Sequence, residues 1–174
     1  MKRSPNPQTR RRRQLRHIRI WLAVFIAGLV LSGLTAFPLA TEMHWLVSAL
    51  HTSWIEPVAQ SAGLLAWIER VSGALAATDA RYPFLAYGTD WLAFAHLVIA
   101  VAFIGPLIDP VRNKWVITFG LIACAGVIPL ALIAGQAREI PLAWRLVDCS
   151  FGVLGSVPLF VCRRLIAAME LDGP

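Results

Sequence analysis

Charged residues are scarce in this chain, and common catalytic motifs are absent from it. Only 15% of the 174 residues are Asp, Glu, Lys or Arg, whereas 57% are hydrophobic. A soluble domain of this size needs more polar surface to cover its core, so the composition argues against a soluble protein. The sequence contains no CxxC, no HExxH and no phosphate-binding glycine loop. We therefore expect no metal site and no nucleotide site, and we predict that the protein is not an enzyme.

Cysteine is also rare. The three cysteines, Cys124, Cys149 and Cys162, all lie within apolar segments. Their placement favours small packing residues over a disulfide framework.

Four long apolar runs are what the chain does contain, and each opens on a tryptophan: Trp21, Trp91, Trp115 and Trp144. An indole fits the headgroup level, where its ring and its N–H both find suitable surroundings. A helix of about 20 residues spans the roughly 30 Å hydrocarbon core. The sequence predicts an all-α integral membrane protein, a bundle of four transmembrane helices at 18–37, 89–108, 115–137 and 142–163.

The basic residues predict the orientation of this bundle. Eight of the 16 Lys and Arg residues lie in the first twenty positions, and others follow the second and fourth runs. The positive-inside rule then places both termini on the cytoplasmic side of a bacterial inner membrane. The cytoplasmic segments would be a basic tail at 1–17, a loop at 109–114 and a tail at 164–174. The arginine block Arg10, Arg11, Arg12 and Arg13 is expected to contact anionic lipid or a partner.

The first run has an alternative interpretation as a cleaved signal peptide. It is longer than a usual signal-peptide core, and no A-x-A sequence follows it. We therefore favour an uncleaved signal-anchor helix.

Residues 38–88 form the one sizeable segment predicted outside the membrane. Apolar residues such as Trp45, Leu46 and Ala49 recur at helical spacing, and Pro57 divides two such stretches. This pattern predicts periplasmic amphipathic helices that lie in the membrane interface or pack over the end of the bundle.

Polar residues gather at the same predicted level, around a periplasmic turn at 138–141. Arg145 and Asp148 are three residues apart and so share a helical face, which allows them to pair. One interpretation is a site for a small anionic or polar ligand beneath Arg145. The other, which we favour, is a structural clamp between helix ends. The candidate cluster consists of Asp90, Gln136, Arg138, Glu139, Arg145 and Asp148.

His96 is the only histidine within a predicted span. A neutral imidazole can ligate a pigment magnesium, but a six-coordinate haem needs a second axial ligand, and no other span offers a histidine. The alternative, which we favour, is a hydrogen bond to a nearby carbonyl or hydroxyl. No cofactor is expected.

Pairs of small residues four apart predict where helices approach closely. They are Gly28 with Ser32, Ala131 with Gly135, and Gly152 with Ser156.

Three functions are compatible with these features. The first is a non-catalytic accessory subunit of a respiratory, photosynthetic or transport complex in the membrane. The second is a small transporter or ligand-binding protein that uses the polar cluster, and the third is a pigment- or haem-binding protein that uses His96. Expected partners are membrane lipids and other membrane protein subunits. Because the positive-inside rule already accounts for where the basic residues lie, no nucleic-acid partner is expected.

Overall fold

The computed structural model describes residues 7–171, and every regular element in that range is helical. Four helical segments are long and apolar enough to cross a membrane: Gln8–Ala36, Pro83–Ile108, Lys114–Ala137 and Leu142–Leu171. The predicted all-α class with four long apolar helices is therefore confirmed. The predicted tails at 1–17 and 164–174 lie partly outside the described residues. The elements in chain order are α1 (Pro7–Ala36), α2 (Leu39–His51), α3 (Glu56–Ser61), α4 (Leu64–Arg81), the 3₁₀ helix η1 (Pro83–Ala86), α5 (Tyr87–Ala102), α6 (Ile104–Ile108), α7 (Lys114–Ala137) and α8 (Leu142–Leu171).

Two helix boundaries differ from the sequence-based spans. Helix α1 begins at Pro7, so the arginine block of the predicted tail is helical. Proline is favourable in the first helical turn, because the N–H that it lacks would have no partner there. Helix α8 continues to Leu171, eight residues beyond the predicted span.

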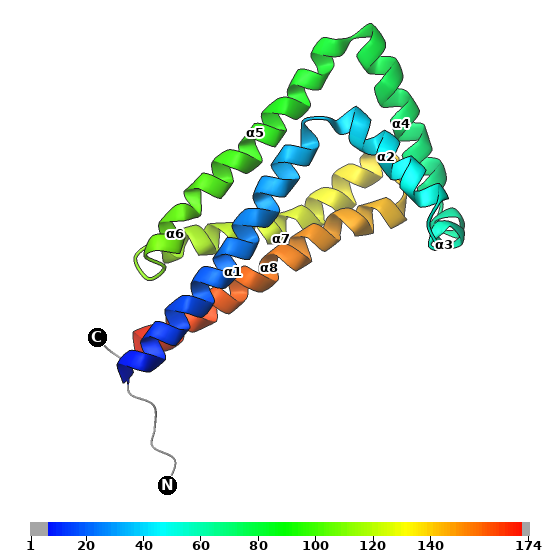
Figure 1. Ribbon diagram of the computed structural model, residues 1–174. Helices are drawn as coiled ribbons and strands as arrows, with labels where there is room; N and C mark the ends of the chain where they lie inside the picture. The colour runs from blue at the N-terminus through cyan, green and yellow to red at the C-terminus, as the bar shows by residue number, and fades with distance from the viewer. Residues whose placement is uncertain (1–6, 172–174) are drawn as a thin grey trace.

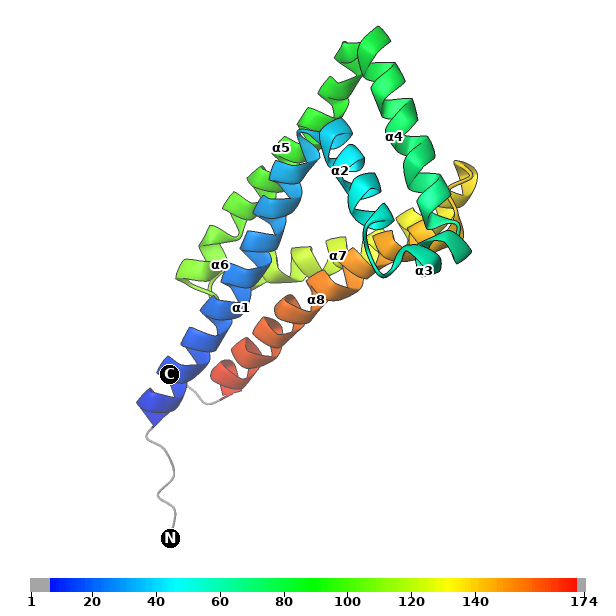
Figure 2. The ribbon, with the colours of Figure 1, turned by 45° about the vertical axis from the view of Figure 1, so that its right-hand side comes forward.

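The long helices form two pairs that spread apart like the sides of a triangle (Figures 1 and 2). Helix α1 packs along α5, and α7 packs along α8, while α1 also crosses α8. The start of α1 and the end of α8 lie at one end of the molecule, which we call the basic end because Arg12, Arg16, Lys114 and Arg163 belong to it. At the other end, α2, α3 and α4 bridge the gap between the two pairs. We call this the α2–α4 end.

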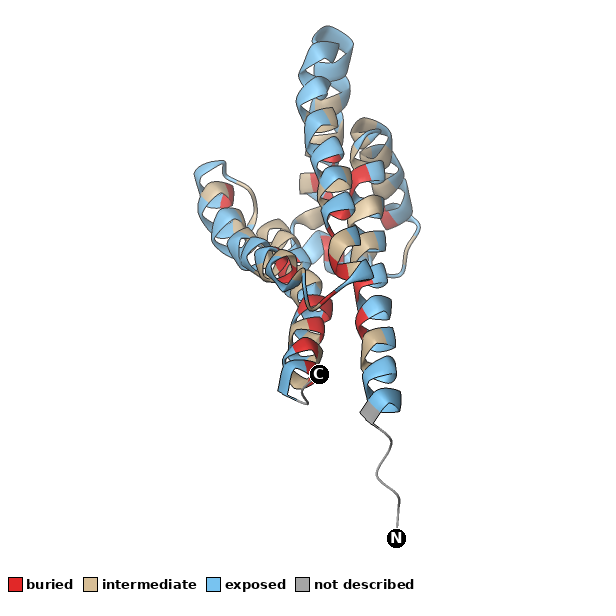
Figure 3. Cartoon of the chain, turned by 90° about the vertical axis from the view of Figure 1, so that its left-hand side faces the viewer, coloured by how far each residue is buried: buried red, intermediate tan, exposed pale blue. Residues whose placement is uncertain are grey.

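The main core lies where the two pairs meet. Ile18, Leu22, Phe103, Ile117 and Leu159 are fully buried there. Elsewhere the long helices are mostly uncovered, as Figure 3 shows. Between 11% and 28% of the residues in the most apolar stretch of each helix are buried. Most of the apolar surface is therefore left for lipid or for another protein.

Glycine allows the helices of each pair to touch at backbone distance. A Cβ at Gly33 in α1 would stand 2.9 Å from the Ala93 carbonyl oxygen of α5. A Cβ at Gly152 in α8 would stand 2.5 Å from the Cys124 carbonyl oxygen of α7. Both positions thus exclude any side chain.

Prolines act differently in the different helices. Pro106 lies four residues after Ala102, the last residue of α5, and a proline ring clashes with the carbonyl group four positions before it. The second predicted span is accordingly divided into α5 and α6. Helices α7 and α8 instead continue through Pro129 and Pro158.

A second, smaller core holds the α2–α4 end together. Leu50, Ala59, Leu65 and Ile68 are buried against one another, and Trp144 at the start of α8 packs on this cluster. The helical character predicted for 38–88 is thus present. Its location in a membrane interface stays a prediction.

Candidate functional site

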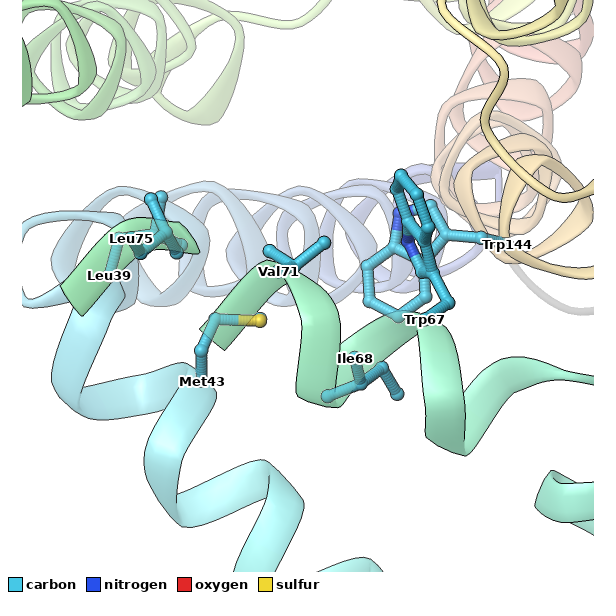
Figure 4. A pocket seen from close by; sticks show the side chains of 7 residues that line it. All are labelled: Leu39, Met43, Trp67, Ile68, Val71, Leu75 and Trp144. Carbon is cyan, nitrogen blue, oxygen red and sulfur yellow. The ribbon is translucent and has the colours of Figure 1, made fainter. Parts of the chain in front are cut away.

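An apolar cavity of about 220 Å³ lies between α2, α4 and the start of α8 (Figure 4). It exists because α2 and α4 pack on each other through one face while Trp144 reaches them from α8. No charged side chain lines it, so its walls favour apolar groups. The lining residues are Leu39, Met43, Trp67, Ile68, Val71, Leu75 and Trp144.

The six residues of the predicted polar cluster do not form an ion-pair network. Asp90 belongs to the first turn of α5, which follows η1 at the top of Figures 1 and 2. The turn between α7 and α8 lies apart from it. Gln136, Arg138 and Glu139 are exposed around that turn. The ion pairs of the described residues involve other side chains. None of the six lines the cavity.

Arg145 is directed at α7. Its Nη1 donates a hydrogen bond to the Leu132 carbonyl oxygen at 3.3 Å, and a Cβ at Gly135 would stand 2.6 Å from its Cδ. Its Nε is buried without a hydrogen-bond partner among the described residues. Since Leu132 and Gly135 belong to the last two turns of α7, the negative end of that helix dipole stabilises the guanidinium.

Glu139 has an unusual backbone conformation, with φ at 57°. It follows the end of α7, where the Ile140 N–H binds the Gly135 carbonyl at 2.9 Å and the Glu139 N–H binds the Gln136 carbonyl at 3.1 Å. These two bonds form a Schellman motif, in which glycine normally occupies this left-handed position. Glu139 therefore shapes the turn between α7 and α8 through its backbone.

His96 lies where α5 crosses α1. Its Nδ1 lies 2.8 Å from the Leu92 carbonyl oxygen, which can only accept a hydrogen bond, so Nδ1 is the donor. The would-be Cβ of Gly33 is 3.2 Å from the His96 Cβ. No group of three His, Cys, Asp or Glu residues within 7–171 is arranged to hold a metal ion.

A histidine bridge at the α2–α4 end was not predicted from the sequence. His51 Nδ1 lies 3.1 Å from Glu56 Oε1, and its Nε2 lies 2.9 Å from Glu69 Oε1. The hydrogen bonds with Glu56 and then Glu69 raise the pKa of His51 above 6.5. The bridge links α2, α3 and α4. Its partners are five and eighteen residues from His51 and lie on other helices, so the three- and four-residue spacings that indicate pairs on one helix give no signal for the bridge.

Side-chain contacts also tie the basic end together. Arg19 of α1 donates through Nε to the Leu107 carbonyl and through Nη2 to the Ile108 carbonyl, each at 3.2 Å. These carbonyls end α6 and have no partner within that helix. Lys114 Nζ lies 2.7 Å from Glu170 Oε1 and joins the start of α7 to the end of α8.

Comparison with known proteins found no match. A scan against protein-family models, a search of curated proteins and a search of solved structures each returned no significant match for this chain. Function is therefore inferred from the packed and unpacked faces of the chain itself.

Proposed function

We propose that this chain is a non-catalytic accessory subunit of a multi-protein membrane complex, and that α1 docks a transmembrane helix of another subunit. The observation that supports this most is an uncovered glycine. A Cβ at Gly28 would have nothing within 4 Å. At Gly33, Gly135 and Gly152, by contrast, the space for a Cβ is occupied by atoms of another helix of this chain.

The residues around Gly28 form a continuous face of α1. Val24 and Leu31 are 56% and 62% exposed, and Ser32 is also exposed. Positions 24, 28 and 31 are four and three residues apart, so they lie on one side of the helix. Lipid chains pack equally well on larger apolar side chains, while a small residue lets another helix approach closely. This face therefore suits a helix better than lipid.

The orientation that we propose follows the distribution of charge. The basic end contains Arg12, Arg16, Arg112, Lys114 and Arg163. The positive-inside rule assigns this end to the cytoplasmic side of a bacterial inner membrane. The α2–α4 end would then lie on the periplasmic side, with its amphipathic helices at the membrane interface.

Affinity purification of the tagged chain at its native level, in a gentle detergent, tests the proposal. Mass spectrometry of the purified peak should identify a stoichiometric membrane partner. Gly28→Leu should remove that partner, because the added side chain occupies the docking face. Gly126→Leu is the matched control: Gly126 is an exposed glycine of α7 that also has nothing within 4 Å, but it has the large residues Ile122 and Leu130 four positions away, where Gly28 has Ser32. Purification of the wild-type chain alone, or a partner that Gly28→Leu retains, would overturn the proposal.

A ligand-binding function is the second candidate, and the cavity of Figure 4 favours it. Its apolar walls suit an alkyl or isoprenoid group better than the small anionic or polar ligand of the alternative interpretation of Arg145. Filling the cavity with Val71→Trp should abolish any ligand-induced rise in melting temperature. A visible absorbance spectrum of the same peak tests the third candidate, because haem or chlorin bound at His96 would absorb strongly.

A further inference from the structure

A shallow groove with a volume of about 530 Å³ runs along α1 at the basic end and reaches α6. Its polar wall consists of three arginines, Arg12, Arg16 and Arg19. These are spaced by four and three residues, so the helix brings their side chains onto one face.

No residue that the structure describes neutralises the charge of this wall. Among residues 7–171, the guanidinium groups of Arg12 and Arg16 have no hydrogen-bond or ion-pair partner, and that of Arg19 binds only neutral carbonyl groups. Two described carboxylates of this end, those of Asp109 and Glu170, have other partners. Asp109 accepts a hydrogen bond from the Arg112 backbone N–H, and Glu170 pairs with Lys114.

The rest of the groove is apolar. Leu15 lies among the arginines, and Ile20, Ala23 and Leu107 continue the groove away from the start of α1. One groove thus presents cationic side chains at the helix end and apolar side chains toward the bilayer. A ligand that matches both parts has an anionic head and an alkyl tail.

We infer that this groove is a binding site for an anionic phospholipid. The lipid phosphate accepts hydrogen bonds from the guanidinium groups of Arg12 and Arg16, and an acyl chain lies along Ile20, Ala23 and Leu107. Guanidinium groups suit this role because their planar array of donors matches the oxygens of a phosphate. Basic pockets at the cytoplasmic ends of transmembrane helices are known to hold such headgroups. The groove and Gly28 lie on different faces of α1, so the inference does not depend on the proposed subunit contact.

The chain offers a matched control for general electrostatic attraction. Arg11 and Arg13 flank Arg12 in the sequence, but each lies about 100° around the helix from it. Neither lines the groove. Arg12→Gln/Arg16→Gln and Arg11→Gln/Arg13→Gln remove the same charge from the same helix, and only the first pair alters the groove.

Native mass spectrometry of the full chain in a neutral detergent measures lipid binding directly. Dioleoyl phosphatidylglycerol is the probe, and dioleoyl phosphatidylcholine is the comparison. The wild-type chain should bind the anionic lipid more tightly. Arg12→Gln/Arg16→Gln should weaken that binding on the order of 30-fold, because it removes the charge-assisted hydrogen bonds that two guanidinium groups donate to the phosphate. Arg11→Gln/Arg13→Gln should weaken it by less than about threefold if the groove binds the lipid.

Three results would overturn the inference: equal losses in the two double variants, no preference for the anionic lipid, or displacement of the lipid by millimolar inorganic phosphate. The last result would define a simple anion site. Ala23→Phe supplies a second test if the arginine variant does not fold. It fills the apolar half of the groove and leaves every arginine in place, so it should also weaken lipid binding.

Discussion

Replacing Gly152 with alanine should separate α7 from α8 and destabilise the whole bundle. The added methyl group would stand 2.5 Å from the Cys124 carbonyl oxygen and 3.3 Å from the Val127 Cβ. Ordinary contact begins at 3.4 Å, so the helices have to move apart by about 0.9 Å. The nearest obstacle is backbone, so no side-chain rotation relieves the contact.

The size of the effect follows from what holds helices together in lipid. A gap of 0.5–1 Å forfeits about a quarter to a half of the dispersion energy between facing atoms. Lipid supplies no hydrophobic drive to offset this loss. Overpacking of a tight interface typically costs about 1–3 kcal/mol, and we expect Gly152→Ala to cost about 2 kcal/mol.

Thermal unfolding in detergent, followed by circular dichroism, measures this change. Gly126→Ala is the control, because a methyl group at Gly126 would meet nothing within 4 Å. Its stability should equal or slightly exceed that of the wild-type chain, since alanine favours helix over glycine by about 1 kcal/mol. If Gly152→Ala melts with or above the control, the close crossing of α7 and α8 is wrong.

Three further predictions concern single side chains. Glu139→Gly should raise the free energy of unfolding by about 1 kcal/mol, because glycine adopts a left-handed conformation without strain, and a lower melting temperature would contradict this. The raised pKa of His51 means that its bridge to Glu56 and Glu69 stabilises the fold fully below pH 6.5 and progressively less as pH rises through the folded-state pKa. The stability difference between wild type and His51→Gln should therefore shrink from pH 6 to pH 9 in parallel melting curves, whereas a constant difference would show that the ring charge is irrelevant. Arg19→Met should destabilise the chain by about 1 kcal/mol in the same assay, because it leaves the last carbonyls of α6 without their donor; an unchanged melting temperature would show that water replaces the guanidinium fully.

Much of the helical organisation was predictable because it depends on local composition. The apolar runs that open at Trp21, Trp91, Trp115 and Trp144 each lie within one of the four long apolar helices or helical segments. The helix break at Phe103 was not predicted, although Pro106 stands in the sequence three residues later. A proline in an apolar run does not by itself predict a break, because α7 continues through Pro129.

The candidate sites were less predictable, because they depend on helix rotation. Gly28 and Gly33 are both small residues of the first run, and the four-residue spacing of Gly28 and Ser32 predicts close packing there. The structure packs Gly33 against α5 and leaves Gly28 uncovered. Five residues correspond to a rotation of about 140° around the helix axis, so Gly28 and Gly33 lie on different sides of α1. The rotation of α1 relative to α5 therefore decides which of the two glycines is packed.

The sequence alone determined that the chain is helical and apolar, where its long helices run and which end gathers the basic residues. These properties follow from hydropathy, helix length and charge, which act over one or two turns. Only the tertiary structure decided that Arg145 is directed at Leu132 and Gly135, that His51 bridges three helices, and that three arginines of α1 share a groove with α6. Those arrangements depend on the rotation and crossing of helices distant in sequence, which backbone contacts at a few glycines determine.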